Sequence, residues 1–238
     1  MLRKWFAITL IAALAGACGT NPMPVATSNE LKLSPPWTGT EHFDYTVMAD
    51  QDGSPIGSGA IDVKPSSDAT TIEQHYQFDK VAQHLVVRID PQSLKPLGGT
   101  QQVSGSPNDY SLATKYQNNE LTIKATTSQG EKDFTLEVAP DAIDNDSVLM
   151  VLRGVPLTDG YSASFHIVVA TTALQVPTTL NVAARETVTV PAGTFNTYKV
   201  TLGFGSGPGQ TAWYEVAAPH RMIQYDNGQD KFVLVKSS

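Results

Sequence analysis

The chain has 238 residues, of which 41% are hydrophobic and 16% charged, and its formal net charge at pH 7 is −7. An acidic chain without a basic stripe interleaved with aromatic residues repels phosphate groups, so we expect no nucleic-acid partner and no electrostatic attraction to anionic lipid. Cys18 is the single cysteine of the sequence, which excludes an intramolecular disulfide.

The first 17 residues predict an export signal. Arg3 and Lys4 precede an apolar run from Trp5 to Ala15, and small residues follow, which is the order found in secretory signal peptides. The run is shorter than the roughly 20 apolar residues needed to span a bilayer, so a retained transmembrane helix is the weaker alternative.

Cys18 is the predicted lipidation site. The preceding residues L-A-G-A resemble a lipobox, although Ala15 stands where leucine is commonest, and an ordinary signal peptide is the alternative. A thioether to diacylglycerol together with an N-acyl chain such as palmitate removes the liability of a free thiol and anchors the chain stably. Gly19 resembles the sorting residue of diderm lipoproteins. We therefore expect a lipid anchor in the cell envelope, on the periplasmic face of the outer membrane.

Residues 18–36 predict a lipidated N-terminus and a flexible tether, because they are rich in Pro, Ser, Thr and Asn and show no sustained period. Residues 37–238 contain no second linker and are expected to form a single β-rich domain. Without the signal peptide the chain has 14 basic and 23 acidic residues, so its attachment to a membrane is expected to depend on lipid.

Alternation of apolar and polar residues predicts β-strands along this body. Phe43, Tyr45 and Val47 share one face of a first strand, and a turn at 50–57 leads to a second around Ile61 and Val63. The further predicted strands lie at 72–78, 85–89, 110–116, 121–125, 134–138, 165–169, 180–190, 195–204, 212–216, 222–225 and 232–235. So many strands with short turns predict an antiparallel sheet.

One helix is predicted, over residues 144–153. Asp144, Asn145 or Asp146 supplies its N-cap, and Gly154 and Pro156 end it. Its apolar face, formed by Val148, Leu149, Val151 and Leu152, is expected to be buried at the mouth or on the concave side of a curved sheet.

Four segments together resemble the uncharacterised exported family DUF3108. They are R-I-D-P-Q-S-L-K-P-L at 88–97, the run D-N-D-S-V-L-M-V-L-R-G-V-P-L-T-D-G from 144, the segment R-E-T-V-T-V-P-A-G-T-F-N-T-Y-K-V from 185, and W-Y-E-V-A-A-P-H-R-M-I-Q-Y from 213. The resemblance covers the chain from about Asp44 to its end. It implies an all-β fold, a curved antiparallel sheet forming a partial or open barrel with one short helix, and it supplies no catalytic residues.

The sequence shows no catalytic motif, and we predict no catalytic residues, no cofactor and no metal. The histidines His42, His75, His84, His166 and His220 are dispersed, without an H-E-x-x-H motif. His75 and His84 are placed to contact each other across neighbouring strands. Such contacts are common between polar residues on the solvent-exposed face of a sheet.

Four residues are candidate contacts for a ligand or partner: Trp213, Tyr214, His220 and Arg153. Trp213 and Tyr214 are interpreted mainly as core and rim aromatics, with a stacking surface in a ligand cleft as the alternative. Arg153 is a cation at the C-terminal end of the helix, where its charge interacts favourably with the helix dipole. Pairing with an acidic ligand is its alternative role.

The leading hypothesis is therefore a non-enzymatic envelope lipoprotein that binds or carries an apolar ligand such as a lipid. The alternative is a structural or assembly factor that docks on another envelope protein. A hydrolase of envelope polymers is a third, less favoured class, which requires convergent titratable groups in a polar cleft, with Glu215 and His220 as neighbouring candidates.

Overall fold

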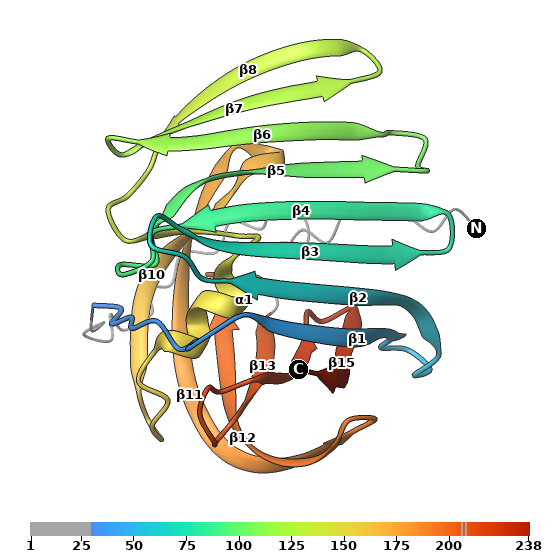
Figure 1. Ribbon diagram of the computed structural model, residues 1–238, viewed down its shortest axis with the longest axis vertical. Coiled ribbons are helices and arrows are strands. Elements are labelled where there is room, and N and C mark those ends of the chain that lie inside the picture. Colours follow the sequence, from blue (N-terminus) through green and yellow to red (C-terminus); the bar gives the residue numbers. More distant parts are fainter. Residues whose placement is uncertain (1–29, 206, 208) are drawn as a thin grey trace.

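Figure 1 shows the computed structural model of the chain, in which we describe residues 30–205, 207 and 209–238. The described residues form one 15-stranded sheet whose order is β8-β7-β6-β5-β4-β3-β2-β1-β15-β14-β13-β12-β11-β10-β9. The strands of the first half are β1 (Glu41–Ala49), β2 (Pro55–Lys64), β3 (Thr70–Phe78), β4 (Val81–Ile89), β5 (Pro96–Ser104), β6 (Tyr110–Gln117), β7 (Glu120–Thr127) and β8 (Gly130–Glu137).

The second half contains the helical residues and the remaining strands. They are β9 (Ala142–Asp144), α1 (Val148–Val151), the 3-10 turns Leu152–Gly154 and Ala170–Thr172, β10 (Ser162–Val169), β11 (Leu174–Val190), β12 (Gly193–Gly203), β13 (Gln210–Glu215), β14 (Met222–Asp226) and β15 (Asp230–Ser237). None of the helices in the described ranges is long and apolar enough to cross a membrane.

Neighbouring strands are antiparallel except for β9 and β10, which run parallel. Each half of the chain forms a series of consecutive neighbours, and the two series join where β1 pairs with β15. The predicted fold class is confirmed: the chain is all-β, with one curved and open sheet and one short helix (Figure 1).

The core lies on the inner face of the sheet and draws on both halves of the chain. Tyr76 of β3 meets Phe232 of β15 edge to face, with ring centroids 5.8 Å apart. The Tyr45 hydroxyl donates to the carbonyl of Met222 at 2.9 Å. Val148 and Val151 of α1 are fully buried in the same core. The helix therefore buries its apolar residues against the inner face, as its composition requires.

The helix is shorter than the predicted span of 144–153. Asp144 ends β9, and α1 begins at Val148 after Ser147, whose side chain makes no capping hydrogen bond. The expected caps are engaged elsewhere: Asp144 accepts hydrogen bonds from the Tyr116 hydroxyl at 2.6 Å and from the Asp146 backbone N–H at 2.8 Å. The prediction of an N-cap at Asp144, Asn145 or Asp146 was wrong, because Asp144 belongs to β9 and bonds to Tyr116, whereas the Asn145 amide donates to the Asp146 carboxylate at 2.9 Å.

The predicted strands are present, and two further strands were missed. The register with β4 places Gly99, Gln101 and Val103 on the inner face of β5, so apolar residues do not alternate along this strand. Gly99 is required by close packing, because a Cβ there would lie 2.2 Å from the carbonyl oxygen of Val86. The other missed strand is the three-residue β9, which falls in the segment assigned to the helix.

The boundary of the predicted tether also differs. Residues 18–29 lie outside the described residues, but residues 30–36 lie against the body. Leu31 and Leu33 pack on the core, and the Ser34 N–H donates to the Gly154 carbonyl at 2.9 Å. The segment from residue 30 onward is therefore part of the folded body, because alternate leucines bury their side chains on one face.

The sheet overlaps itself at its two ends. Leu112 of β6 and both Leu121 and Ile123 of β7 cluster with Val168 of β10. Ile167 and Val169, its neighbours in the strand, face the main core, so Val168 lies on the opposite face of β10. The inner face of β6–β7 thus covers the outer face of β10.

Two carboxyl groups lie next to this overlap. Asp144 is buried and Asp146 half-buried. Desolvation raises the pKa of both groups, and the neighbouring Asp144 charge helps to raise the pKa of Asp146 to about 7. Between about pH 4 and pH 7 the unfolded chain has lost a proton that the folded chain retains at Asp146. This residue therefore makes the protein less stable as the pH rises through that window.

Replacing Asp146 with Asn should remove this penalty. We expect Asp146→Asn to be more stable than the parent protein at pH 8 by about 2 kcal/mol, and the difference to shrink at pH 4. Urea denaturation of both proteins at the two pH values measures it, with Asp133→Asn on the exposed strand β8 as the matched control. An Asp146→Asn effect of equal size at both pH values would contradict the assignment.

Candidate functional site

Arg153 has an acidic partner within the chain. Its side chain is 0% exposed, and its guanidinium donates to both oxygens of Glu41, at 2.7 and 3.0 Å. The same group donates to the backbone carbonyl of Pro219 at 2.9 Å and to that of His220 at 3.1 Å, and it lies 5.2 Å from the Phe43 ring centroid. Arg153 therefore ties the end of the helical segment to the start of β1 and to the loop before β14.

The two predicted aromatic candidates point to opposite faces of β13. Tyr214 is fully buried in the core, where its hydroxyl donates to the Leu149 carbonyl at 2.8 Å. The indole N–H of Trp213 donates to the Glu186 carboxylate, and the ammonium group of Lys199 lies 5.5 Å from its ring centroid. Both residues thus have protein partners.

Glu215 and His220 lie close together, but without a carboxylate–imidazole contact. The His220 Nδ1 bonds to the backbone carbonyl of Glu215 at 2.9 Å, whereas the Glu215 carboxylate accepts two hydrogen bonds from Arg221, at 2.7 and 3.0 Å. Neither of the two hollows described below is lined by Arg153, Trp213, Tyr214 or His220. Their contact with a ligand stays a prediction, and Cys18 lies outside the described residues.

The outer face of β1–β5 carries a separate set of polar residues. Directly paired residues of neighbouring strands point to the same face. The strand registers place five residues in one row across this face: Asp44, Ala60, His75, His84 and Gln102. A second row, on one side of it, contains Ser58, Gln77, Ala82 and Ser104.

These two rows border a hollow of about 370 Å³. The small side chains of Ser58, Ala60 and Ala82 leave room above the backbone. Longer side chains stand around them, from Asp44, His75, Gln77, His84 and Gln102. A second hollow, of about 10 Å³, lies near Asp144 and Asp146 and has room for about one water molecule.

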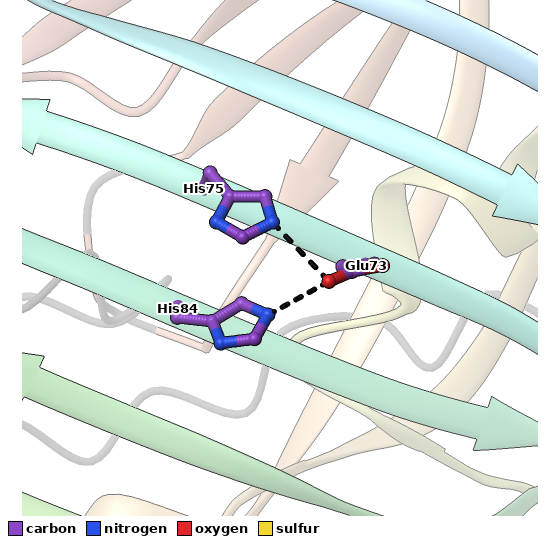
Figure 2. Close-up of side chains that lie close together, drawn as sticks. All are labelled: Glu73, His75 and His84. Carbon is purple, nitrogen blue, oxygen red and sulfur yellow. Dashed lines mark hydrogen bonds and ion pairs between the residues drawn. The ribbon is translucent and has the colours of Figure 1, made fainter.

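Three side chains converge at the border of the larger hollow. Figure 2 shows His75 and His84 side by side, both pointing toward Glu73. The Nε2 atoms of His75 and His84 lie 3.2 and 3.0 Å from the same carboxylate oxygen, Oε1. The two imidazole rings are stacked, with centroids 4.3 Å apart and an interplanar angle of 10°.

The other oxygen of Glu73 binds Lys64, whose Nζ donates to Oε2 at 2.7 Å. This bond and those from the two histidines lower the pKa of Glu73 to about 2, so the carboxylate is ionised at neutral pH. The contact between His75 and His84 was predicted from the sequence, but the contact of Glu73 with both histidines was missed. The spacing Glu73-x-His75 could have indicated it, because residues two apart in a strand lie on the same face.

Comparison with known proteins gives a family and a fold. The family model "Protein of unknown function (DUF3108)" matches residues 43–235. Among solved structures, the chain is similar to the crystal structure of a β-barrel-like protein of the domain of unknown function DUF1849 from Brucella abortus. The sequence identity is 13%, the TM-score is 0.57, and the match covers 84% of this chain and 97% of the other. No curated protein matches the chain in sequence.

The buried ion pair of Arg153 and Glu41 generates a prediction for stability. We expect Arg153→Met to destabilise the fold by about 3–5 kcal/mol, because it leaves a largely buried carboxylate without its partner. The double variant Arg153→Met/Glu41→Leu should recover most of the loss. Chemical denaturation measures both.

Arg185→Met is the matched control, since Arg185 pairs with Asp159 where both side chains are more than half exposed. Exposed pairs contribute about 0–1 kcal/mol. Equal losses in Arg153→Met and Arg185→Met would show that the internal pair does not hold these elements together.

Proposed function

The chain belongs to the DUF3108 family, and we propose that it is a lipid-anchored, non-enzymatic binding protein of the cell envelope whose ligand occupies the hollow on the outer face of β1–β5. The observation that carries this proposal is the hollow itself. Its volume of about 370 Å³ is within the range of small-molecule sites, and polar side chains from five strands converge on it.

The polar lining favours a small ligand with hydrogen-bonding groups. Gln102 offers an amide donor and acceptor, His75 and His84 offer imidazoles, and Asp44 offers a carboxylate. The amide nitrogen of Gln77 already donates to the carbonyls of Asp79 and Val81, which leaves its oxygen as an acceptor. The floor is formed by strands held in a continuous ladder, so a ligand would meet a surface that is already formed. Such preorganisation lowers the entropic cost of binding.

An apolar ligand on the concave side, the hypothesis drawn from the sequence, requires a different arrangement. Tyr45, Phe165 and Tyr214 are fully buried there, and α1 packs among them. A lipid chain would have to displace these side chains. The geometry therefore favours the outer hollow over the interior as the ligand site.

Docking on another envelope protein is the second candidate function. The observation that favours it is strand β8, which ends the sheet and is exposed along nearly its whole length. An edge strand of this kind can pair with an extended segment of a partner. Its charged residues Glu131, Lys132 and Asp133 would select a partner of complementary charge.

The hollow is tested by filling it. We expect envelope-derived small molecules to raise the unfolding temperature of the full-length, detergent-purified protein in a saturable manner. Ala60→Trp should raise the ligand concentration needed for half of this stabilisation at least tenfold. The control is Ala113→Trp, exposed on β6 outside the hollow. An effect unchanged by Ala60→Trp would refute the site, and co-purified lipid detected by native mass spectrometry would favour the interior instead.

The anchor is tested at Cys18. We expect Cys18→Ser to release the protein from the membrane fraction without changing its unfolding temperature, because the thioether to diacylglycerol cannot form. Alkaline extraction of membranes followed by immunoblotting measures the distribution. A Cys18→Ser variant that stays in the membrane pellet would contradict lipid anchoring.

A further inference from the structure

We propose that Glu73, His75 and His84 form a binding site for a divalent transition-metal ion, of which Zn²⁺ and Cu²⁺ are the best matches, at the border of the outer hollow. Metal binding follows from the geometry of these three side chains alone. The role of the ion in holding a ligand deepens the proposed function and rests on it.

The donor set suits such an ion. Imidazole nitrogen favours zinc, copper and nickel, and a carboxylate oxygen completes a set of two histidines and one acid. Three protein ligands leave a further coordination position, as in zinc sites that act on a bound molecule. Among the described residues, the ligand atoms of Glu73, His75 and His84 all lie within 4.8 Å of one another.

Two of the three distances between the ligand atoms match those around a bound metal ion. With metal–ligand bonds of about 2.0–2.1 Å, two ligand atoms of a tetrahedral site are about 3.3 Å apart. The Glu73 Oε1 lies 3.2 Å from His75 Nε2 and 3.0 Å from His84 Nε2. The ion would therefore take the place of two hydrogen bonds, and the two stacked imidazoles, whose centroids are 4.3 Å apart, would turn toward each other around it.

The backbone fixes this arrangement. His75 and His84 are directly paired in the β3–β4 hairpin, and Glu73 precedes His75 by two residues on the same face. Only Asp79 and Lys80 separate the two strands, and Asp79 takes the positive φ of 49° that short hairpin turns use. Sites built on strands in this way are more rigid than sites on loops.

The orientation of the carboxylate and the access from solvent also suit a metal ion. Lys64 binds Oε2 of Glu73 and leaves Oε1 to the histidines, so the carboxylate is oriented by a partner beyond the ligands, as metal ligands commonly are. The side chains of His75 and His84 are 51% and 43% exposed, which lets an ion enter from solvent. Because both residues also line the hollow, a molecule bound there would reach the ion.

The competing explanation is a carboxylate that simply bridges two surface histidines. The other histidines on the surface illustrate such pairs and serve as controls. His166 bonds to Asp141 at 2.7 Å, and His42 lies between Asp44 and Asp62, at 3.1 and 2.9 Å. Each offers one imidazole, whereas Glu73 is shared by two.

The experiment uses the full-length protein purified in detergent without a histidine tag and treated with a chelator. Titration calorimetry with Zn²⁺ alone is expected to show one ion per chain with micromolar or tighter affinity. His75→Gln and His84→Gln should each weaken binding at least tenfold, and His166→Gln should leave it unchanged. With Cu²⁺, electron paramagnetic resonance should show coupling to two nitrogens in the parent protein and to one in each single variant.

Equal Zn²⁺ affinity in the parent, His75→Gln and His84→Gln proteins would overturn the site, as would no binding at 100 µM Zn²⁺. Unfolding temperatures of the variants verify that these exposed substitutions leave the fold intact. The proposed function is tested separately by ligand-induced stabilisation with and without Zn²⁺. Loss of metal binding with ligand stabilisation retained refutes only the metal site, whereas metal binding without ligand stabilisation refutes only the proposed function.

Discussion

The antiparallel pairing of β1 with β15 is the constraint on which the rest of the fold depends. Every other pairing in the described sheet joins elements that are close in sequence, whereas this one joins the start of the folded chain to its end. Without it the two series of strands would each expose an inner face. Closing so long a loop costs conformational entropy, and burial of aromatic residues from both series, such as Tyr76 against Phe232, offsets that cost.

This closure also separates the two faces of the sheet by role. Inner-face residues fill the core together with α1, so their identity is set by packing. The outer face of β1–β5 is free of that demand, and small residues such as Ala60 and Ala82 can stand there beside longer polar ones. The ladder that supports the core therefore also holds His75 and His84 in register, which gives the outer site a rigid base.

The sequence revealed what depends on local periodicity and missed what depends on distant partners. Alternation located most strands and the meeting of His75 with His84, because a hairpin brings its own residues together. It missed β5, whose buried residues include Gly98 and Gln101, and it placed the helix start too early, at Asp144, which Tyr116 engages from 28 residues away. The partnership of Arg153 with Glu41 spans 112 residues and has no local signature.

The filled interior has a consequence for function. A protein that carries a ligand inside a curved sheet keeps an apolar space there for the ligand, although empty space in a core costs stability. Here Tyr45, Phe165 and Tyr214 are each at most 2% exposed, and α1 closes the concave side with its own buried residues. Under the proposed function, binding takes place at the surface, where the outer face combines room, polar groups and a carboxylate shared by two imidazoles. Selection for binding would act on exposed residues of β1–β5, which can change without cost to the core.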